Sequence, residues 1–519
     1  MANQGVAATK LAPGIENGTR RVTAWLEARP GLILAVFSVL YCAGEGSYAS
    51  AAALSHDEVW TLLVTKLPGW SGVWEGLAGG ADFHPPLHYM LAQSGRLLLD
   101  GSLLGFRLSS LFGFWLFSIC VFAFVMRRCG VVFAAIAMMA PFAAATQHSP
   151  YLARGYALML GFNALAMLCW QRSSAGRLRP LALAGLGISI FLAAASHYYG
   201  VLIVACLAVA EIASSKARRR IDKAVWLAMG AGVAALASLW PLIEAASQHV
   251  SGFWATPSLE GLLTVYQYLL SEAVSPAVCA FLAILLFDRI LGRRAAVERE
   301  PRGSPVPDSE YALAITVSLL PFIVFALAKA VTNAFAVQYV LPTVAGLAIC
   351  FVFHASERLA RRELAGLVLF SCFFGWFVIQ QRYLFLRGRE LAAQPSLAFP
   401  SNVNFDSIDP ERKLAIVAPN RVEYLQFVHY WPVEYSRRLY LLTPDSGPPD
   451  HLEALARWSE LRVRRYREFV QAQGRFLVYG TGGEPGGWVL RRLAEEGARI
   501  ELKGWWADQP LFEVTVSGG

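Results

Sequence analysis

The stretch "LFGFWLFSICVFAFVMRRCGVVFAAIAMMAPF" (Leu111–Phe142) consists of two apolar runs that are separated by Arg127 and Arg128. With their flanks, the runs cover residues 102–126 and 130–148. Each run is close to the ~20 residues that a helix needs to cross the hydrocarbon core of a bilayer. Paired arginines between two such runs are typical of a cytoplasmic turn. The stretch therefore predicts two consecutive membrane spans.

The same pattern continues along most of the chain. Of the 519 residues, 56% are hydrophobic and 16% are charged, whereas soluble proteins average ~45–50% and ~25%. Apolar runs separated by short basic clusters are the signature of a polytopic helical membrane protein. We therefore expect a mainly α protein with about eleven transmembrane helices, at residues 30–47, 102–126, 130–148, 155–170, 181–197, 199–214, 224–243, 274–291, 311–331, 334–354 and 364–382.

The distribution of lysine and arginine predicts the orientation of these spans. If the N-terminal segment 1–29 is cytoplasmic, the inner loops hold 22 Lys and Arg residues, and the outer loops before the last span hold five. The expected transmembrane domain is 30–382, with a long first outer loop at 48–101. The net charge of +8 is mostly this topology signal, so no basic face for nucleic acid is expected. The sequence predicts a multi-pass protein of the cytoplasmic (inner) membrane.

An odd number of spans places residues 383–519 outside the cytoplasm, where their pattern indicates a small α/β domain. "KLAIVAP", "RLYLLTP", "RFLVYGT" and "LFEVTV" are typical of strands, and Arg421–Tyr430, His451–Gln471 and Trp488–Ala498 of helices. The loop "GTGGEPGG" lacks the G-x-G-x-x-G spacing of a dinucleotide site, because Pro485 occupies the third glycine position. A plain turn is expected there.

Ionisable side chains gather at the predicted outer ends of the spans and in the outer loops. Such groups at membrane depth are costly and mark functional sites by default, although any one of them could be an interfacial side chain. In "ADFHPPLHYM" (Ala81–Met90), Pro85 and Pro86 interrupt helical structure, so a helix should begin just after them. The group comprises Glu45, His56, Asp57, Glu58, Asp82, His84, His88, His148, Arg154, His197, Glu244 and Lys329.

Five elements resemble motifs of GT-C glycosyltransferases, in the order in which that superfamily has them. They are "HDE" in the first outer loop, "DFHPPLHYMLAQ", "SPYLARGYALMLGFNAL", "SHYYG" and "QYVLPTVAG". Together they resemble the protein O-mannosyltransferases and the lipid A aminoarabinose transferases over residues 30–350. The resemblance implies a sugar donor linked to polyprenyl phosphate and a reaction on the outer face. The chain departs from the family at Gln338, where R-Y-x-L-P has arginine.

The resemblance also suggests roles for particular residues. Transfer to a hydroxyl needs a general base, for which we choose Asp57, with Glu58 as support or metal ligand and Glu58 or Asp82 as alternative bases. The leaving lipid phosphate needs cations or hydrogen-bond donors, for which we choose Arg154 and Tyr151, with Lys329 as a second candidate. Expected substrate contacts are His56, Asp82, His84, His197, Gln338 and Tyr339. No cofactor is implied except a divalent metal ion, for which Glu58, His84 and His197 are candidate ligands.

The leading hypothesis is an inverting glycosyltransferase that acts at the bilayer on a protein, lipid or polysaccharide acceptor. A transporter or flippase for lipid-linked glycans is the alternative, but it would place charges in both halves of the membrane or broken helices near the midplane. A non-catalytic scaffold would leave the acid-rich outer loop unexplained.

Overall fold

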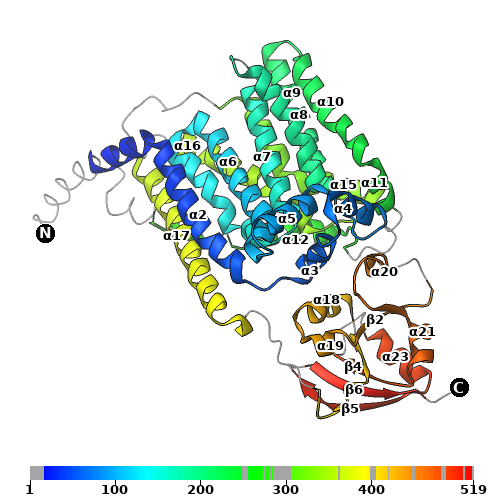
Figure 1. The fold of residues 1–519 in the computed structure, drawn as a ribbon. Coiled ribbons are helices and arrows are strands. Elements are labelled where there is room, and N and C mark those ends of the chain that lie inside the picture. The colour runs from blue at the N-terminus through cyan, green and yellow to red at the C-terminus, as the bar shows by residue number, and fades with distance from the viewer. Residues whose placement is uncertain are drawn as a thin grey trace, which may run out of the picture. The chain divides into compact units, whose positions relative to one another are not determined.

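A computed structural model shows a chain built mainly of helices (Figure 1). It describes residues 17–174, 176–247, 255–272, 275–280, 282–283, 306–359, 363–397, 405–418, 420–446, 451–480, 487–506 and 509–516. The chain forms two compact units. The first comprises Met1–Ala49, Arg107–Pro241 and Val250–Gly388, and the second comprises Ser50–Phe106, Leu242–His249 and Arg389–Gly519. The first outer loop of the sequence therefore belongs to the same unit as the C-terminal domain.

The first unit consists of helices, of which α7, α8, α9 and α10 lie side by side in Figure 1. Its α-helices include α2 (Pro30–Ala51), α6 (Leu103–Met139), α7 (Tyr156–Arg172), α8 (Arg179–Ser196), α9 (Ile203–Arg218), α10 (Lys223–Ala234), α12 (Leu259–Leu270), α14 (Asp308–Ser318), α15 (Leu320–Leu327), α16 (Thr343–Leu359) and α17 (Glu363–Ala393). Helix α11 (Trp240–Ser247) lies mostly in the second unit. Short turns join them, namely η1 (Ala140–Ala143), η2 (Ala145–Tyr151), η3 (Tyr198–Leu202), η4 (Ala235–Leu239), η5 (Ala328–Thr332) and η6 (Val337–Val340).

The helices confirm a multi-pass membrane protein. Among the described residues, six helical stretches are long and apolar enough to cross a membrane, or up to eight if each of two bent pairs is one span. The expected spans 102–126 and 130–148 form one stretch, Leu103–Ala143, that is broken at Gly130. The expected span 274–291 lies mostly outside the described residues. The expected span 334–354 corresponds to α16, which has only 17 residues.

The break at Gly130 shows why the two arginines precede a turn. Gly130 has φ 80°, a conformation that favours glycine. The carboxylate of Glu27 accepts hydrogen bonds from the backbone N–H groups of Val131 (2.7 Å) and Val132 (3.2 Å). The acid thus caps the N-terminus of the second helical segment and complements its dipole.

Charged side chains join three helices beside this break. The guanidinium of Arg128 donates from Nε to both oxygens of Glu310 on α14, at 3.0 and 3.1 Å. Gln171 at the end of α7 also donates to Glu310 (3.0 Å), and its own carbonyl accepts from Arg127 (3.1 Å). Because Glu310 is buried, these partners are what make its burial tolerable.

Small residues allow the helix backbones to approach closely, as is common in membrane bundles. A Cβ atom at Gly113 on α6 would lie 2.6 Å from backbone atoms of Ala157 and Leu158 on α7. A Cβ atom at Gly161 on α7 would lie 2.4 Å from the carbonyl of Gly113. Helices α6 and α7 therefore cross at a contact that admits no larger residue without a shift.

The second unit contains three helices of the first outer loop and a C-terminal α/β domain. The loop helices are α3 (His56–Val64), α4 (Gly69–Ala78) and α5 (Leu87–Leu98). The domain has the strands β1 (Ala415–Ala418), β2 (Leu439–Thr443), β3 (Val463–Arg465), β4 (Arg475–Tyr479), β5 (Arg499–Trp506) and β6 (Gln509–Thr515). Its helices are α18 (Arg421–Tyr430), α19 (Val433–Ser436), α20 (His451–Ala456), α21 (Tyr466–Ala472) and α23 (Trp488–Glu495).

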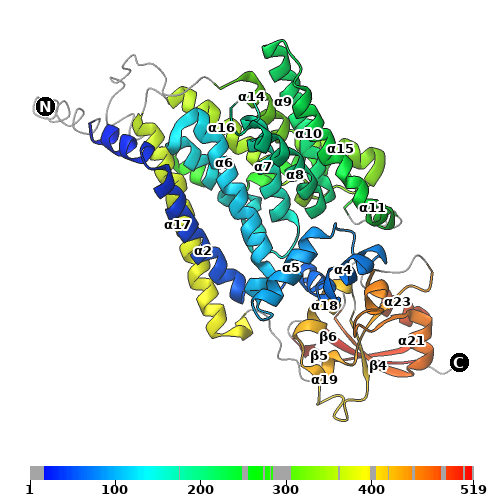
Figure 2. The ribbon, with the colours of Figure 1, turned by 45° about the horizontal axis from the view of Figure 1, so that its top comes forward.

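The sheet of this domain has the strand order β3-β2-β1-β4-β6-β5. Figure 2 shows the sheet and labels β4, β5 and β6. Strands β3, β2, β1 and β4 are parallel, and β6 pairs antiparallel with both β4 and β5. Strand β1 is buried at every position, as expected for a central parallel strand. One face packs against Phe469 of α21 and Leu493 of α23. The expected α/β class is thus confirmed.

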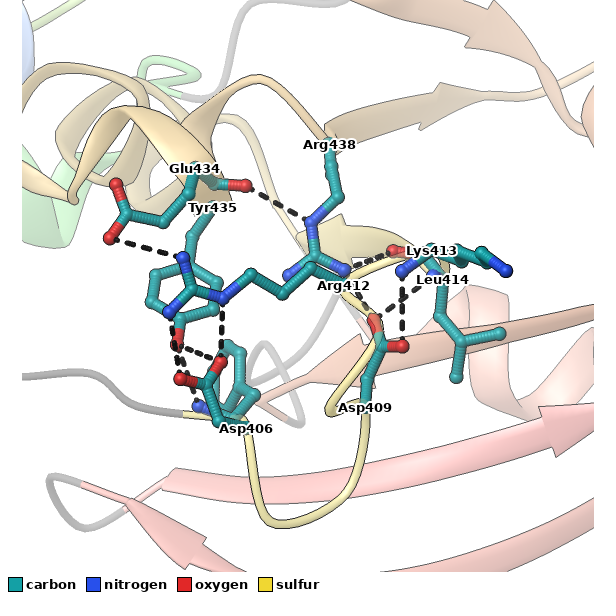
Figure 3. A network of polar contacts seen from close by, with 9 residues as sticks. Asp406, Asp409, Arg412, Lys413, Leu414, Glu434, Tyr435 and Arg438 are labelled. Carbon is teal, nitrogen blue, oxygen red and sulfur yellow. Dashed lines mark hydrogen bonds and ion pairs between the residues drawn. The ribbon is translucent and has the colours of Figure 1, made fainter.

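A polar network fixes the chain where it enters this sheet (Figure 3). The buried carboxylate of Asp409 accepts from the backbone N–H groups of Lys413 and Leu414, both at 3.0 Å, and from the guanidinium of Arg438. The backbone carbonyl of Arg438 in turn accepts from Ile416 of β1 (2.8 Å). Residues just before β1 and β2 are therefore tied together, which sets where both strands begin.

A second part of the network lies on the solvent side. Arg412 donates to both oxygens of Asp406, at 2.9 and 2.8 Å, and the Tyr435 hydroxyl donates to Asp406 at 2.9 Å. These hydrogen bonds lower the pKa of the Asp406 carboxyl below its ordinary value, and the hydrogen bond from Arg412 has the larger effect.

Two elements of the domain differ from the sequence prediction. The predicted helix His451–Gln471 is divided into α20 and α21 by the edge strand β3. Strand β3 has only three residues, two of them arginines, so it shows no alternation, and it forms because Val463 pairs with Leu441 of β2. Strand β5 was not predicted either, because it is a half-exposed edge strand with a bulge after Leu502.

Candidate functional site

The acidic motif of the first outer loop lies at the N-terminus of α3. Ser55 is the N-cap, and its hydroxyl accepts from the N–H of Glu58 (3.3 Å). The carboxylate of Glu58 accepts in return from the N–H of Ser55 (3.0 Å), which completes a capping box. Glu58 is only 2% exposed. Its carboxylate is therefore engaged in starting the helix.

Asp57 is placed differently, although it precedes Glu58 directly. Its side chain is 43% exposed and lies beside His56, with 3.6 Å between Oδ1 and the histidine Nε2. The capping box fixes the backbone around Asp57 and leaves its carboxylate at the surface of this unit. The two neighbouring acids therefore have different environments, since Glu58 is buried in the capping box and Asp57 is exposed.

The histidine-proline segment is organised by Asp82. Its buried carboxylate accepts from the N–H of Phe83 (2.6 Å) and the hydroxyl of Tyr89, and it lies 3.2 Å from Nδ1 of His84. Helix α5 begins at Leu87, directly after the two prolines, as predicted. Asp82 therefore joins the turn before α5 to the first turns of that helix and orients the imidazole of His84.

An aromatic cluster in the first unit contains two of the predicted substrate contacts, His197 and Tyr339. His197 ends α8, and its ring centroid lies 5.0 Å from that of Tyr339 and 5.3 Å from that of Tyr156. Tyr199 stacks on Tyr339 at 4.5 Å, and its hydroxyl is 2.6 Å from that of Thr332. Gln338 is adjacent to Tyr339 in η6 and half-buried. Sequence reasoning missed Tyr156 and Tyr199, although both lie in the quoted motifs.

The predicted phosphate-binding residues occupy two settings within the first unit. Arg154 is 6% exposed and lies just before α7, where its carbonyl accepts from Ser110 of α6. Tyr151 bonds through its hydroxyl to His148 (2.5 Å) and packs edge-on against Tyr48. Lys329 is exposed instead, on the π-helical turn η5, with Nζ 5.9 Å from the ring of Phe325. Arg154 is thus the desolvated cation of the two.

Metal binding gains no support from the part of the chain that the structure describes. No group of three or more His, Cys, Asp or Glu side chains there could hold a metal ion. Of the candidate ligands Glu58, His84 and His197, the first serves as a helix cap and the second contacts Asp82.

Comparison with known proteins gives a structural likeness. No protein-family model and no curated protein matches the sequence. The structure of ArnT from Cupriavidus metallidurans bound to undecaprenyl phosphate matches with a TM-score of 0.51 and 13% identity, over 95% of this chain and 98% of that one. The same protein in the apo state matches with a TM-score of 0.52 and 12% identity, with the same coverage. The chain therefore has the fold of ArnT over nearly its whole length, as the motifs predicted.

Proposed function

We propose that this protein, which has the fold of ArnT, is a membrane glycosyltransferase. It transfers a sugar from a polyprenyl-phosphate-linked donor to an acceptor hydroxyl, with inversion, on the outer face of the cytoplasmic membrane. The observation that carries the proposal is the likeness over 95% of the chain to a structure that holds undecaprenyl phosphate. Because a fold can host several functions, the placement of individual side chains supplies the rest of the argument.

The general base of the reaction is Asp57. Of the three acids considered, Glu58 caps α3 and Asp82 holds the turn before α5, whereas the carboxylate of Asp57 is 43% exposed. A base must lie within hydrogen-bond reach of the proton that it removes. The acceptor hydroxyl gives its proton to Asp57, its oxygen bonds to the anomeric carbon, and the bond from that carbon to the phosphate oxygen breaks. Polyprenyl phosphate leaves with the bonding electrons.

The leaving phosphate is stabilised by Arg154. A buried guanidinium offers two parallel donors to a phosphate, and its charge acts more strongly where water is excluded. Tyr151, three residues earlier in the chain, adds a hydroxyl, and Lys329 is the second candidate cation. Gln338 stands where the family pattern has arginine, so it contributes an amide contact to the substrate rather than a charge on the phosphate.

His197 and Tyr339 bind the sugar or the lipid end of the donor within the aromatic cluster. The ring centroids of His197 and Tyr339 lie 5.0 Å apart, and the ring of Tyr199 stacks on that of Tyr339. Aromatic faces suit the apolar faces of sugar rings and isoprenoid chains. His56 and His84 serve the acceptor, since each lies beside an acid of the second unit. The distribution of lysine and arginine supports a position outside the cytoplasm for residues 48–101 and 383–519.

Mass spectrometry of envelope glycoconjugates tests the proposal. We expect a cell that lacks the gene to lose one sugar from a glycan, lipid or protein and to accumulate the corresponding lipid-linked sugar. A cell that expresses Asp57→Asn should show the same loss, and one that expresses Glu58→Gln should not. Unchanged glycoconjugates in the deletion strain would overturn the proposal. A transporter of lipid-linked glycans would instead retain its activity in Asp57→Asn.

A further inference from the structure

Helix α18 of the C-terminal domain packs against α3, the helix that begins with the acidic motif. Both helices belong to the second unit, and Figure 1 shows them next to each other. The hydroxyl of Tyr430, the last residue of α18, accepts a hydrogen bond from the backbone N–H of Leu54. Leu54 is 1% exposed. This bond joins residues that are 376 positions apart in the sequence.

This hydrogen bond is made next to the N-cap of α3, the helix that carries Asp57 in its first turn. Leu54 directly precedes Ser55, the N-cap of α3, and Asp57 is the second residue of the helix. Tyr430 holds the residue before the cap, and the capping box of Ser55 and Glu58 holds the first turn. Because Leu54 is buried, its N–H would have to find water or remain without a partner if the hydroxyl were removed.

Helix α18 is itself held firmly by the sheet. It follows the central strand β1, and the side chain of Asn420 caps its N-terminus by accepting from the N–H of Glu423 (2.9 Å). Tyr424 is buried and its hydroxyl accepts from the N–H of Arg462 (2.7 Å), just before β3. Near the C-terminal end, Phe427 stacks on Trp431 at 4.3 Å.

These contacts form a continuous path from the sheet to the acidic motif. The network of Asp409 and Arg438 fixes the starts of β1 and β2, between which α18 lies in the chain. From α18, the hydroxyl of Tyr430 then reaches the backbone N–H of Leu54. Because packed helices and strands deform little, these contacts fix the position of Leu54, and with it the start of α3, relative to the sheet.

From this path we infer that the C-terminal α/β domain positions the acidic motif, and that Tyr430 is a positioning residue for Asp57. The inference rests on the proposed function, because it takes Asp57 to be the base. It gives the domain a role in the reaction that requires no ligand of its own. A general base displaced by about 1 Å can lose ~10²-fold in rate, so a single anchoring bond matters.

Kinetics of Tyr430→Phe in the full-length, membrane-reconstituted protein test this inference. The variant keeps the ring and removes the acceptor for the Leu54 N–H. We expect kcat to fall ~10-fold to 10²-fold, with KM for the lipid-linked donor nearly unchanged, because the donor ligands are not on α3. Tyr440→Phe is the matched control. It removes a hydroxyl that bonds to Arg462 in the same domain (3.0 Å), and it should leave kcat unchanged.

A double variant separates positioning from a general loss of structure. In an Asp57→Asn background, Tyr430→Phe should cause no further fall in kcat, because its effect passes through Asp57. An equal fold-loss in both backgrounds, or wild-type kcat for Tyr430→Phe, would overturn the inference.

Hydrogen exchange of the peptide that contains Leu54 provides a measurement without turnover. Exchange should be faster in Tyr430→Phe than in the wild type or in Tyr440→Phe, and unchanged exchange would overturn the inference. If the wild type transfers no sugar, the proposed function fails, whereas this exchange result still reports whether α18 holds the start of α3.

Discussion

Replacement of Asp57 by asparagine should abolish most of the transferase activity, whereas replacement of its neighbour Glu58 by glutamine should leave the activity nearly unchanged. Glutamine at the third helical position can still accept from the Ser55 N–H, so the capping box survives in Glu58→Gln. Asparagine at Asp57 keeps the shape and removes the basic oxygen. We expect Asp57→Asn to lose about 10²–10⁴ in kcat, which corresponds to ~3–5 kcal/mol of transition-state stabilisation.

Loss of the Ser55 cap should lower the stability of the second unit. Ser55→Ala removes the acceptor of the Glu58 N–H and should lower the stability of the unit by ~1 kcal/mol. Its loss of kcat should be smaller than that of Asp57→Asn. Thermal unfolding in detergent measures the first effect, and kcat with a fixed lipid-linked donor measures the second. If Glu58→Gln lost about 10²–10⁴ in kcat while Asp57→Asn kept nearly wild-type turnover, Glu58 would be the base and our assignment would be refuted.

Arg154→Lys should raise KM for the donor and lower kcat, because lysine offers a point charge in place of a paired donor; unchanged constants would identify Arg154 as an interfacial anchor. Gly130→Ala should cost ~1–3 kcal/mol in thermal unfolding, since its Cβ would lie 2.9 Å from the Glu27 carboxylate at φ 80°, whereas Gly46→Ala, with no atom within 4 Å, should not destabilise the protein. The pKa of Asp406 is lowered from 3.8 chiefly by Arg412, so its stabilising contribution should be present above about pH 4 and lost as the pH falls through the lowered value; unfolding of Arg412→Gln should depend less on pH in that range. Cysteines introduced in 48–101 and 383–519 should react with an impermeant reagent from outside, and one in the Lys216–Lys223 loop should not.

The sequence predicted those features that depend on local patterns. Apolar runs and basic clusters predicted the helices of the first unit, and Pro85 with Pro86 predicted where α5 begins. Strand β3 was not predicted, because its extended conformation depends on pairing with β2 and its three residues show no strand pattern of their own. The break at Gly130 was placed within a few residues by Arg127 and Arg128.

The roles of the candidate site residues stay predictions, and the sequence says less about their geometry. The motif Ser55-x-x-Glu58 already fits a capping box, and that signal would have separated Glu58 from Asp57. The bond between Tyr430 and Leu54 has no local signal, because it joins segments that only the folded chain brings together. The same is true of the stacking of Tyr199 on Tyr339.

The stereochemistry of transfer tests the central claim most directly. The purified protein is reconstituted in liposomes with a lipid-linked sugar of known anomeric configuration and with acceptor from the deletion strain. We predict that each sugar transferred releases one polyprenyl phosphate and carries the inverted configuration at its anomeric carbon, and that Asp57→Asn does neither at a comparable rate. Retention of configuration, or release of polyprenyl phosphate without a glycosylated acceptor, would contradict an inverting transfer assisted by Asp57.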